Sequence, residues 1–180
     1  MSVQVVSVAI AALEEAMQSE GIQHSFQCTF MCEIKEGLHA WEEDVMKTIQ
    51  PRHRPCLFTD IKEYWRDQCP CKIHKRTCPV GFDIDGAVTG LSCKGFSKQN
   101  PDIWSRRRGS VLDSEASPGK SADAWWRLVK YIDRANLKWL ILENSDELLG
   151  DNAADFSKIR SVLGVRGFSV RPTIICASQY

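Results

Sequence analysis

The sequence Gly90-Leu91-Ser92-Cys93-Lys94-Gly95-Phe96-Ser97 places a cysteine in a glycine-flanked loop directly after the apolar run 87–89. Later in the chain a second apolar run, 139–142, ends directly in Glu143-Asn144. Short apolar runs bounded by turn residues are typical of buried strands, and parallel sheets bind ligands at the carboxyl ends of their strands. The two runs therefore predict a thiol and a carboxylate at one edge of a parallel sheet.

Helical and strand-like patterns alternate along the rest of the chain. One of the helices should bury an apolar face made of Leu38, Trp41, Val45 and Ile49. Alternation of this kind predicts an α/β fold with a doubly wound, mostly parallel sheet. The predicted helices cover 6–17, 38–49, 125–132 and 156–163, and the predicted strands cover 26–32, 56–58, 84–89, 139–142 and 172–177.

Four of the predicted strands end at side chains that carry chemistry, namely Glu33, Asp60, Cys93 and Glu143. Because the carboxyl ends of parallel strands meet at one edge, this coincidence predicts a binding crevice there. The polar, basic segment 99–121 contains prolines and glycines and is typical of a long functional loop.

Bulk composition is that of an ordinary globular chain: 180 residues, 43% apolar, 26% charged and no net charge. A neutral chain has no overall field that would draw it to nucleic acid, so contacts with DNA would have to come from local basic clusters. The apolar start has no basic residue before it, and no apolar run is long enough to span a bilayer. We therefore expect an intracellular protein, and a nuclear one if its source is eukaryotic.

The eight cysteines do not form the pattern of a disulfide framework. Cys28, Cys32, Cys56 and Cys176 lie inside apolar, strand-like runs, where free cysteine behaves as a small buried hydrophobe.

Several segments resemble the cytosine-5 DNA methyltransferase family. Residues 90–97 resemble its nucleophile loop, usually G-x-P-C-Q-x-F-S, and Leu142-Glu143-Asn144-Ser145 resembles its E-N-V motif. Phe30-Met31-Cys32-Glu33 and Phe58-Thr59-Asp60-Ile61 are similar to two strands of the family's cofactor site, and 168–180 resembles the approach to a later motif. The resemblance covers most of the chain in family order, and it implies a Rossmann-like fold that binds S-adenosylmethionine.

The resemblance assigns the catalytic roles to Cys93, Glu143 and Asn144. Carbon 5 of cytosine is a poor nucleophile, so a thiolate must first add at carbon 6, and Cys93 would supply it. Glu143 would stabilise the charge that develops at ring nitrogen 3, while Asn144 orients the loop. The product would be DNA methylated at carbon 5 of cytosine.

The same resemblance names the residues that hold the two substrates. Glu33 would bind the ribose of S-adenosylmethionine, and Asp60 with Ile61 would contact its adenine. The target cytosine must leave the duplex to reach the thiol. The candidates for contacting the nucleic acid are Ser97, Arg106, Arg107 and Arg108.

The chain departs from the family pattern in two ways. Ser92, Lys94 and Ser145 replace the usual proline, glutamine and valine. The family also has a glycine-rich cofactor loop before a helix like 6–17, and an arginine motif and a target-recognition region after the last segment. We therefore expect residues 1–180 to be a partial catalytic domain, truncated at both ends, that holds the cofactor half and the nucleophile loop but no target-recognition region.

A separate cluster, Cys69, Cys71, His74 and Cys78, has the spacing C-x-C-x2-H-x3-C. Three thiols and an imidazole are a legitimate tetrahedral zinc set, although C-x-C is less common in such sites than C-x2-C. Two alternatives to an active methyltransferase therefore stay open: a catalytically inactive remnant of the fold, and a zinc-stabilised module that binds nucleic acid.

Overall fold

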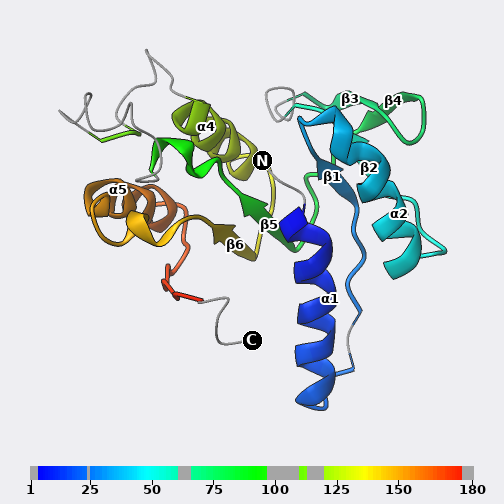
Figure 1. Ribbon diagram of the computed structural model, residues 1–180, viewed down its shortest axis with the longest axis horizontal. Helices are drawn as coiled ribbons and strands as arrows, with labels where there is room; N and C mark the ends of the chain where they lie inside the picture. The colour runs from blue at the N-terminus through cyan, green and yellow to red at the C-terminus, as the bar shows by residue number, and fades with distance from the viewer. Residues whose placement is uncertain (1–3, 24, 61–65, 97–109, 113–119, 176–180) are drawn as a thin grey trace. The chain divides into compact units, whose positions relative to one another are not determined.

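The computed structural model describes residues 4–23, 25–60, 66–96, 110–112 and 120–175 (Figure 1). The chain divides into two compact units. The first comprises Met1–Ser92 and Ala124–Glu143, and the second comprises Cys93–Asp123 and Asn144–Tyr180.

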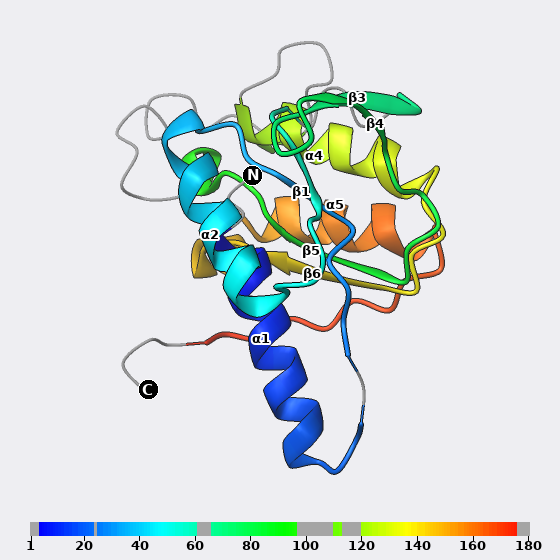
Figure 2. The ribbon, with the colours of Figure 1, turned by 90° about the vertical axis from the view of Figure 1, so that its right-hand side faces the viewer.

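The first unit contains all the strands of the described chain. Its helix α1 is ended by Gly21, whose positive φ of 73° lets the chain turn, and the Ile22 N–H then donates to the Met17 carbonyl at 2.8 Å. Helix α1 lies beside α2 and contacts β5 (Figure 2). The elements are α1 (Gln4–Ser19), β1 (Phe30–Cys32), η1 (Glu36–Leu38), α2 (His39–Ile49), β2 (Cys56–Phe58), β3 (Gln68–Cys71), β4 (Arg76–Pro79), β5 (Gly86–Gly90), β6 (Trp139–Glu143) and the greater part of α4 (Lys120–Ile132).

The strands pair two by two. β1 pairs with β2 and β5 pairs with β6, both in parallel, whereas β3 and β4 form an antiparallel hairpin. A cavity of about 660 Å³ is lined both by residues 25–32 and by residues 83–89, so the edges of β1 and β5 do not hydrogen-bond. The prediction of an α/β chain with parallel strand pairs is confirmed, but within the described residues the pairs do not join into one doubly wound sheet.

The register of β5 and β6 is fixed by a close contact between Gly86 and Trp139. These residues are Cα partners, and a Cβ atom on Gly86 would lie 1.8 Å from the Trp139 ring. The same ring packs edge-on against Phe26, with centroids 6.1 Å apart. Only glycine fits beneath the indole, so the ring and the glycine together select this pairing.

Two local predictions need correction. Helix α2 turns a different face inward, because Glu42 and Met46 are buried while Trp41 is 40% exposed. At the other end, residues 172–175 form no strand, and Cys176 and Ala177 lie outside the described residues. Residues 68–79, for which the sequence predicts no strand, form the β3–β4 hairpin. Buried and exposed residues alternate along β3.

The second unit is built around α5 (Ala153–Gly164), with the short turns η3 (Cys93–Gly95) and η4 (Asp146–Leu148). The Asp155 carboxylate anchors the neighbouring segment: it accepts the Ser110 hydroxyl and the backbone N–H groups of Val111 and Leu112, the latter two at 3.2 and 3.0 Å. Its buried apolar residues include Phe96, Leu112, Ala122, Leu148, Ile159 and Leu163.

The prediction that cysteines of the apolar runs are buried is confirmed for two of them. Cys28 and Cys32 are buried, but Cys56 is only partly buried and lies among other sulfur atoms. Across the described ranges, no helix has the length and apolar character required to cross a bilayer.

Candidate functional site

The two central motifs leave the same edge of the β5–β6 pair. Gly90 is the Cα partner of Glu143, and the Leu91 N–H donates to the Glu143 carbonyl at 3.3 Å. Parallel pairing brings the carboxyl ends of both strands together (Figure 1). The cysteine loop, residues 90–97, and the acidic motif, residues 143–145, therefore start from neighbouring backbone positions.

Cys93 is exposed and opens the short turn η3. Three contacts fix the backbone of that turn: Phe96 N–H donates to the Cys93 carbonyl at 2.8 Å, Gly95 N–H donates to Ser121 Oγ at 3.0 Å, and Asn152 Nδ2 donates to the Phe96 carbonyl at 2.9 Å. The Phe96 side chain is fully buried. Ser121 and Asn152 thus hold the backbone of the turn that carries the thiol, through contacts that the sequence pattern does not reveal.

Glu143 is exposed at the end of β6 and is followed by Asn144, which is partly buried. Asn144 Oδ1 accepts the Ser145 N–H at 2.9 Å, whereas its buried Nδ2 has no hydrogen-bond partner among the described residues. A buried amide donor without an acceptor is costly, which makes Nδ2 a group available for a partner.

Glu33 and Asp60 follow the ends of the neighbouring strands β1 and β2. The Glu33 N–H donates to the Phe58 carbonyl at 3.1 Å, and the Glu33 carboxylate accepts the Lys35 N–H at 2.7 Å. Glu33 is 1% exposed and Asp60 is half-buried. Pairing thus brings two acidic residues to one strand edge, as predicted, while Ile61 lies outside the described residues.

A second buried acid, Glu42, accompanies Glu33. Neither oxygen of the Glu42 carboxyl has a hydrogen-bond partner among the described residues, and its side chain is fully buried. Burial, and next the nearby charge of Glu33, raise the pKa of Glu42 to about 7. Glu42 lies four residues before Met46 on the buried face of α2, a face that the apolar pattern of the sequence does not indicate.

The predicted nucleic-acid contacts, Ser97, Arg106, Arg107 and Arg108, lie outside the described residues. The described chain resumes at Ser110, where Asp155 holds residues 110–112. The segment that carries the three arginines therefore leads into a firmly bound stretch.

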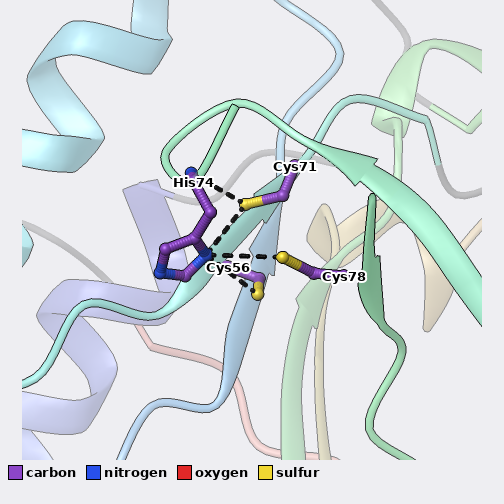
Figure 3. A group of neighbouring side chains, drawn as sticks. All are labelled: Cys56, Cys71, His74 and Cys78. Carbon is purple, nitrogen blue, oxygen red and sulfur yellow. Dashed lines mark hydrogen bonds between the residues drawn. The ribbon is translucent and has the colours of Figure 1, made fainter. Parts of the chain in front are cut away.

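Three of the four predicted metal ligands lie together, and Cys56 takes the place predicted for Cys69. Donor atoms of Cys56, Cys71, His74 and Cys78 all lie within 4.8 Å of one another, and Cys69 is not in that group (Figure 3). Nδ1 of His74 lies 3.3 Å from the Cys71 sulfur and 3.5 Å from those of Cys56 and Cys78. Cys56 begins β2, whereas the other three belong to the β3–β4 hairpin and its turn.

Two thiols of this cluster have shifted pKa values of opposite direction. Burial, followed by the charge of Cys71, raises the pKa of Cys56 to about 12. Burial opposes ionisation of Cys71 too, but backbone N–H groups of His74, Leu57 and Ile73 outweigh it and lower the pKa of Cys71.

Comparison with known proteins identifies the family. The chain is 24% identical over 166 residues to the type II methyltransferase M.Sau3AI of Staphylococcus aureus, which covers 90% of this chain and 31% of that protein. The chain thus spans about a third of the length of that relative. No solved structure matches it. The model of C-5 cytosine-specific DNA methylases matches residues 10–180, and the chain therefore belongs to the C-5 cytosine-specific DNA methylase family.

Proposed function

We propose that this chain carries the catalytic thiol and acid of an enzyme that methylates carbon 5 of cytosine in DNA. The observation that carries the proposal is the pairing of Gly90 with Glu143, because it starts the cysteine loop and the acidic motif at one sheet edge. Membership of the C-5 cytosine-specific DNA methylase family supports the same reaction.

Cys93 is the nucleophile in this mechanism. Its thiolate adds to carbon 6 of the cytosine ring, forming an S–C6 bond and pushing electron density toward carbon 5 and ring nitrogen 3. The exposure of Cys93 and the hydrogen bonds that hold its turn suit a thiol that must meet a substrate. After carbon 5 has taken up the methyl group, loss of its proton lets the S–C6 bond break and returns the thiolate.

Glu143 acts as the acid. A carboxylic acid beside ring nitrogen 3 donates a hydrogen bond or proton to the charge that builds there as the thiolate attacks. Glu143 is exposed as the last residue of β6, so its carboxyl is accessible to a base. Asn144 orients the adjoining segment through its Oδ1 contact with Ser145.

The residues at the β1–β2 edge fit S-adenosylmethionine, which supplies the methyl group as an electrophile when bound. Glu33 is a buried acid at a strand end, where a carboxylate can accept ribose hydroxyls, and Asp60 follows the neighbouring strand. The two carboxyl oxygens of Glu42, which have no hydrogen-bond partner among the described residues, are further polar groups near Glu33. In this assignment Glu33 and Asp60, with Ile61, bind the nucleoside part of the cofactor.

DNA is the second substrate in this proposal. The target base would be extruded from the duplex to meet Cys93. Ser97 and the arginines at 106–108 would contact the phosphate backbone near the extruded nucleotide.

Exchange of hydrogen at carbon 5 tests the proposal, since reversible addition of Cys93 to carbon 6 makes that hydrogen labile. We expect the chain to release tritium from DNA that carries [5-³H]cytosine, and Cys93→Ser to abolish the release. Ser161→Ala, an exposed change on α5, is the matched control and should release tritium like the wild type. Release that persists in Cys93→Ser, or no release from the wild type, would refute the proposal.

A further inference from the structure

We propose that Cys56, Cys71, His74 and Cys78 form a structural zinc site that joins strand β2 to the β3–β4 hairpin. The four ligands come from two separate parts of the first unit, and their donor atoms converge on one point (Figure 3). The observations that support this site do not depend on the proposed methyl transfer.

The distances match a tetrahedral zinc ion. Zinc lies about 2.3 Å from thiolate sulfur and about 2.0 Å from imidazole nitrogen, so a tetrahedron requires sulfur–nitrogen separations of about 3.5 Å. The three separations from His74 Nδ1 are 3.3, 3.5 and 3.5 Å. The three sulfur–nitrogen separations thus match those of a zinc coordination sphere, and all four donor atoms lie within 4.8 Å of one another.

Hydrogen bonding alone does not account for this arrangement. A neutral imidazole nitrogen offers either one hydrogen or one lone pair, so Nδ1 of His74 can satisfy one sulfur well and not three. A cation at the centre would bind all four lone pairs at once. Three thiolates and one imidazole favour zinc among biological metals, and four protein ligands leave no open position for catalysis.

The hairpin turn holds the ligands in place before any metal binds. Lys75 adopts a left-handed φ of 53°, which reverses the chain immediately after His74. The His74 N–H donates to the Cys71 sulfur at 3.4 Å, and Ile73 packs against the core cluster that contains Leu57. Such N–H to sulfur contacts orient a metal-bound thiolate.

The fourth ligand makes the site a cross-link. Cys56 opens β2, and the Lys72 N–H of the hairpin turn donates to the Leu57 carbonyl of the same strand at 2.8 Å. Zinc with three thiolates carries one net negative charge, and the exposed side chains of Lys72, Lys75 and Arg76 surround the turn with positive charge. The metal would therefore fix the hairpin to the strand that leads to Asp60.

Metal analysis of the purified chain tests the site. After expression with added zinc, we expect about one zinc ion per chain for the wild type and a loss of most of it in Cys56→Ser. Cys69→Ser is the matched control, because Cys69 is a buried cysteine of the same hairpin outside the ligand group, and it should keep its zinc. A zinc-free wild type, or equal zinc loss in both variants, would overturn the proposal.

Cobalt substitution keeps the test decisive if Cys56→Ser does not fold. Wild-type protein loaded with Co²⁺ should show thiolate-to-cobalt charge transfer and the intense d–d bands of a tetrahedral site. His74→Cys should retain the metal and shift those bands toward the four-thiolate pattern, whereas His74→Ala should bind cobalt more weakly. Weak octahedral-type bands, or a spectrum that His74→Cys leaves unchanged, would contradict the assignment.

Discussion

The sulfur of Cys56 lies 3.5 Å from Nδ1 of His74, across a sequence separation of 18 residues. The contact joins the first residue of β2 to the turn of the β3–β4 hairpin. It turns a local cysteine-rich hairpin into part of the framework that positions a predicted cofactor residue, Asp60, because that residue follows β2 directly.

Removing the metal should destabilise the first unit. Because a structural zinc ion binds only the folded arrangement of its ligands, its loss lowers the free energy of unfolding, here by about 3 kcal/mol or more. Thermal unfolding with and without a strong chelator measures this effect. The Cys69→Ser protein should respond to the chelator like the wild type, and a Tm that the chelator leaves unchanged in the zinc-loaded wild type would count against the site.

Gly86→Ala should disrupt the β5–β6 pair. The new Cβ would lie 1.8 Å from the Trp139 ring, so the indole must move or the strands must separate, at a cost of about 2 kcal/mol or more. Chemical denaturation measures the loss. Gly164→Ala is the control, since nothing lies within 4 Å of its added Cβ and alanine suits a helix end.

A second substitution identifies the cause of that loss. Trp139→Leu removes the ring from above Gly86, so the double variant should recover part of the stability lost in Gly86→Ala. Strictly additive losses in the two single variants would mean that the ring contact does not fix the register.

Glu42→Gln should stabilise the chain above neutral pH. The folded pKa of Glu42 is raised from 4.5 to about 7, so the folded state holds a proton that the unfolded state has released across that window. Wild-type stability must therefore fall as pH rises from 4.5 through 7, by up to about 3 kcal/mol. Denaturation curves at pH 5 and pH 8 should differ less for Glu42→Gln than for the wild type.

Glu43→Gln is the control, because the contribution of Glu43 to stability depends on pH with the opposite sign. Hydrogen bonds from Lys47 and Arg54 lower the pKa of Glu43, so its stabilising contribution is present above its unfolded pKa and disappears as the pH falls. Lys47 and Arg54 are exposed, so solvent screens both ion pairs and their contribution to stability is small. If Glu42→Gln showed the same pH slope as the wild type, its assignment as a buried acid would be wrong.

Asp155→Asn should loosen the segment at 110–112. The buried carboxylate accepts the Ser110 hydroxyl and two backbone N–H groups, and an amide cannot accept all three, which costs about 1–3 kcal/mol. Hydrogen exchange at Val111 and Leu112 should accelerate. Asp146→Asn, at an exposed position in η4, should change neither the stability nor the exchange rates at Val111 and Leu112. Slow exchange at Leu112 in Asp155→Asn would contradict the role of the carboxylate.

The sequence predicts those helices and strands in which apolar residues recur at a regular spacing. The apolar runs before Cys93 and Glu143 predicted two strands, and both form within a residue or two of the expected bounds. Their parallel pairing followed from the alternation of helices and strands. The register could not be predicted, because it depends on the Gly86–Trp139 contact between segments distant in sequence.

Long-range side-chain contacts explain the remaining differences. Cys56 sits in an apolar run that predicts a core thiol, and only the folded hairpin brings it to Cys71 and His74. The helical spacing of the apolar residues predicts a face of α2 that includes Trp41, whereas packing buries Glu42 next to Glu33. Ser121 and Asn152 likewise gain their roles from contacts 26 and 56 residues away.

Covalent trapping on modified DNA detects attack of Cys93 on a cytosine ring. Fluorine at carbon 5 cannot leave as a proton, so DNA containing 5-fluorocytosine should stay bound to the enzyme after methyl transfer from S-adenosylmethionine. The account predicts a denaturation-resistant adduct whose mass maps to the peptide that contains Cys93, and its loss in Cys93→Ser. No adduct, or an adduct on another residue, would contradict it.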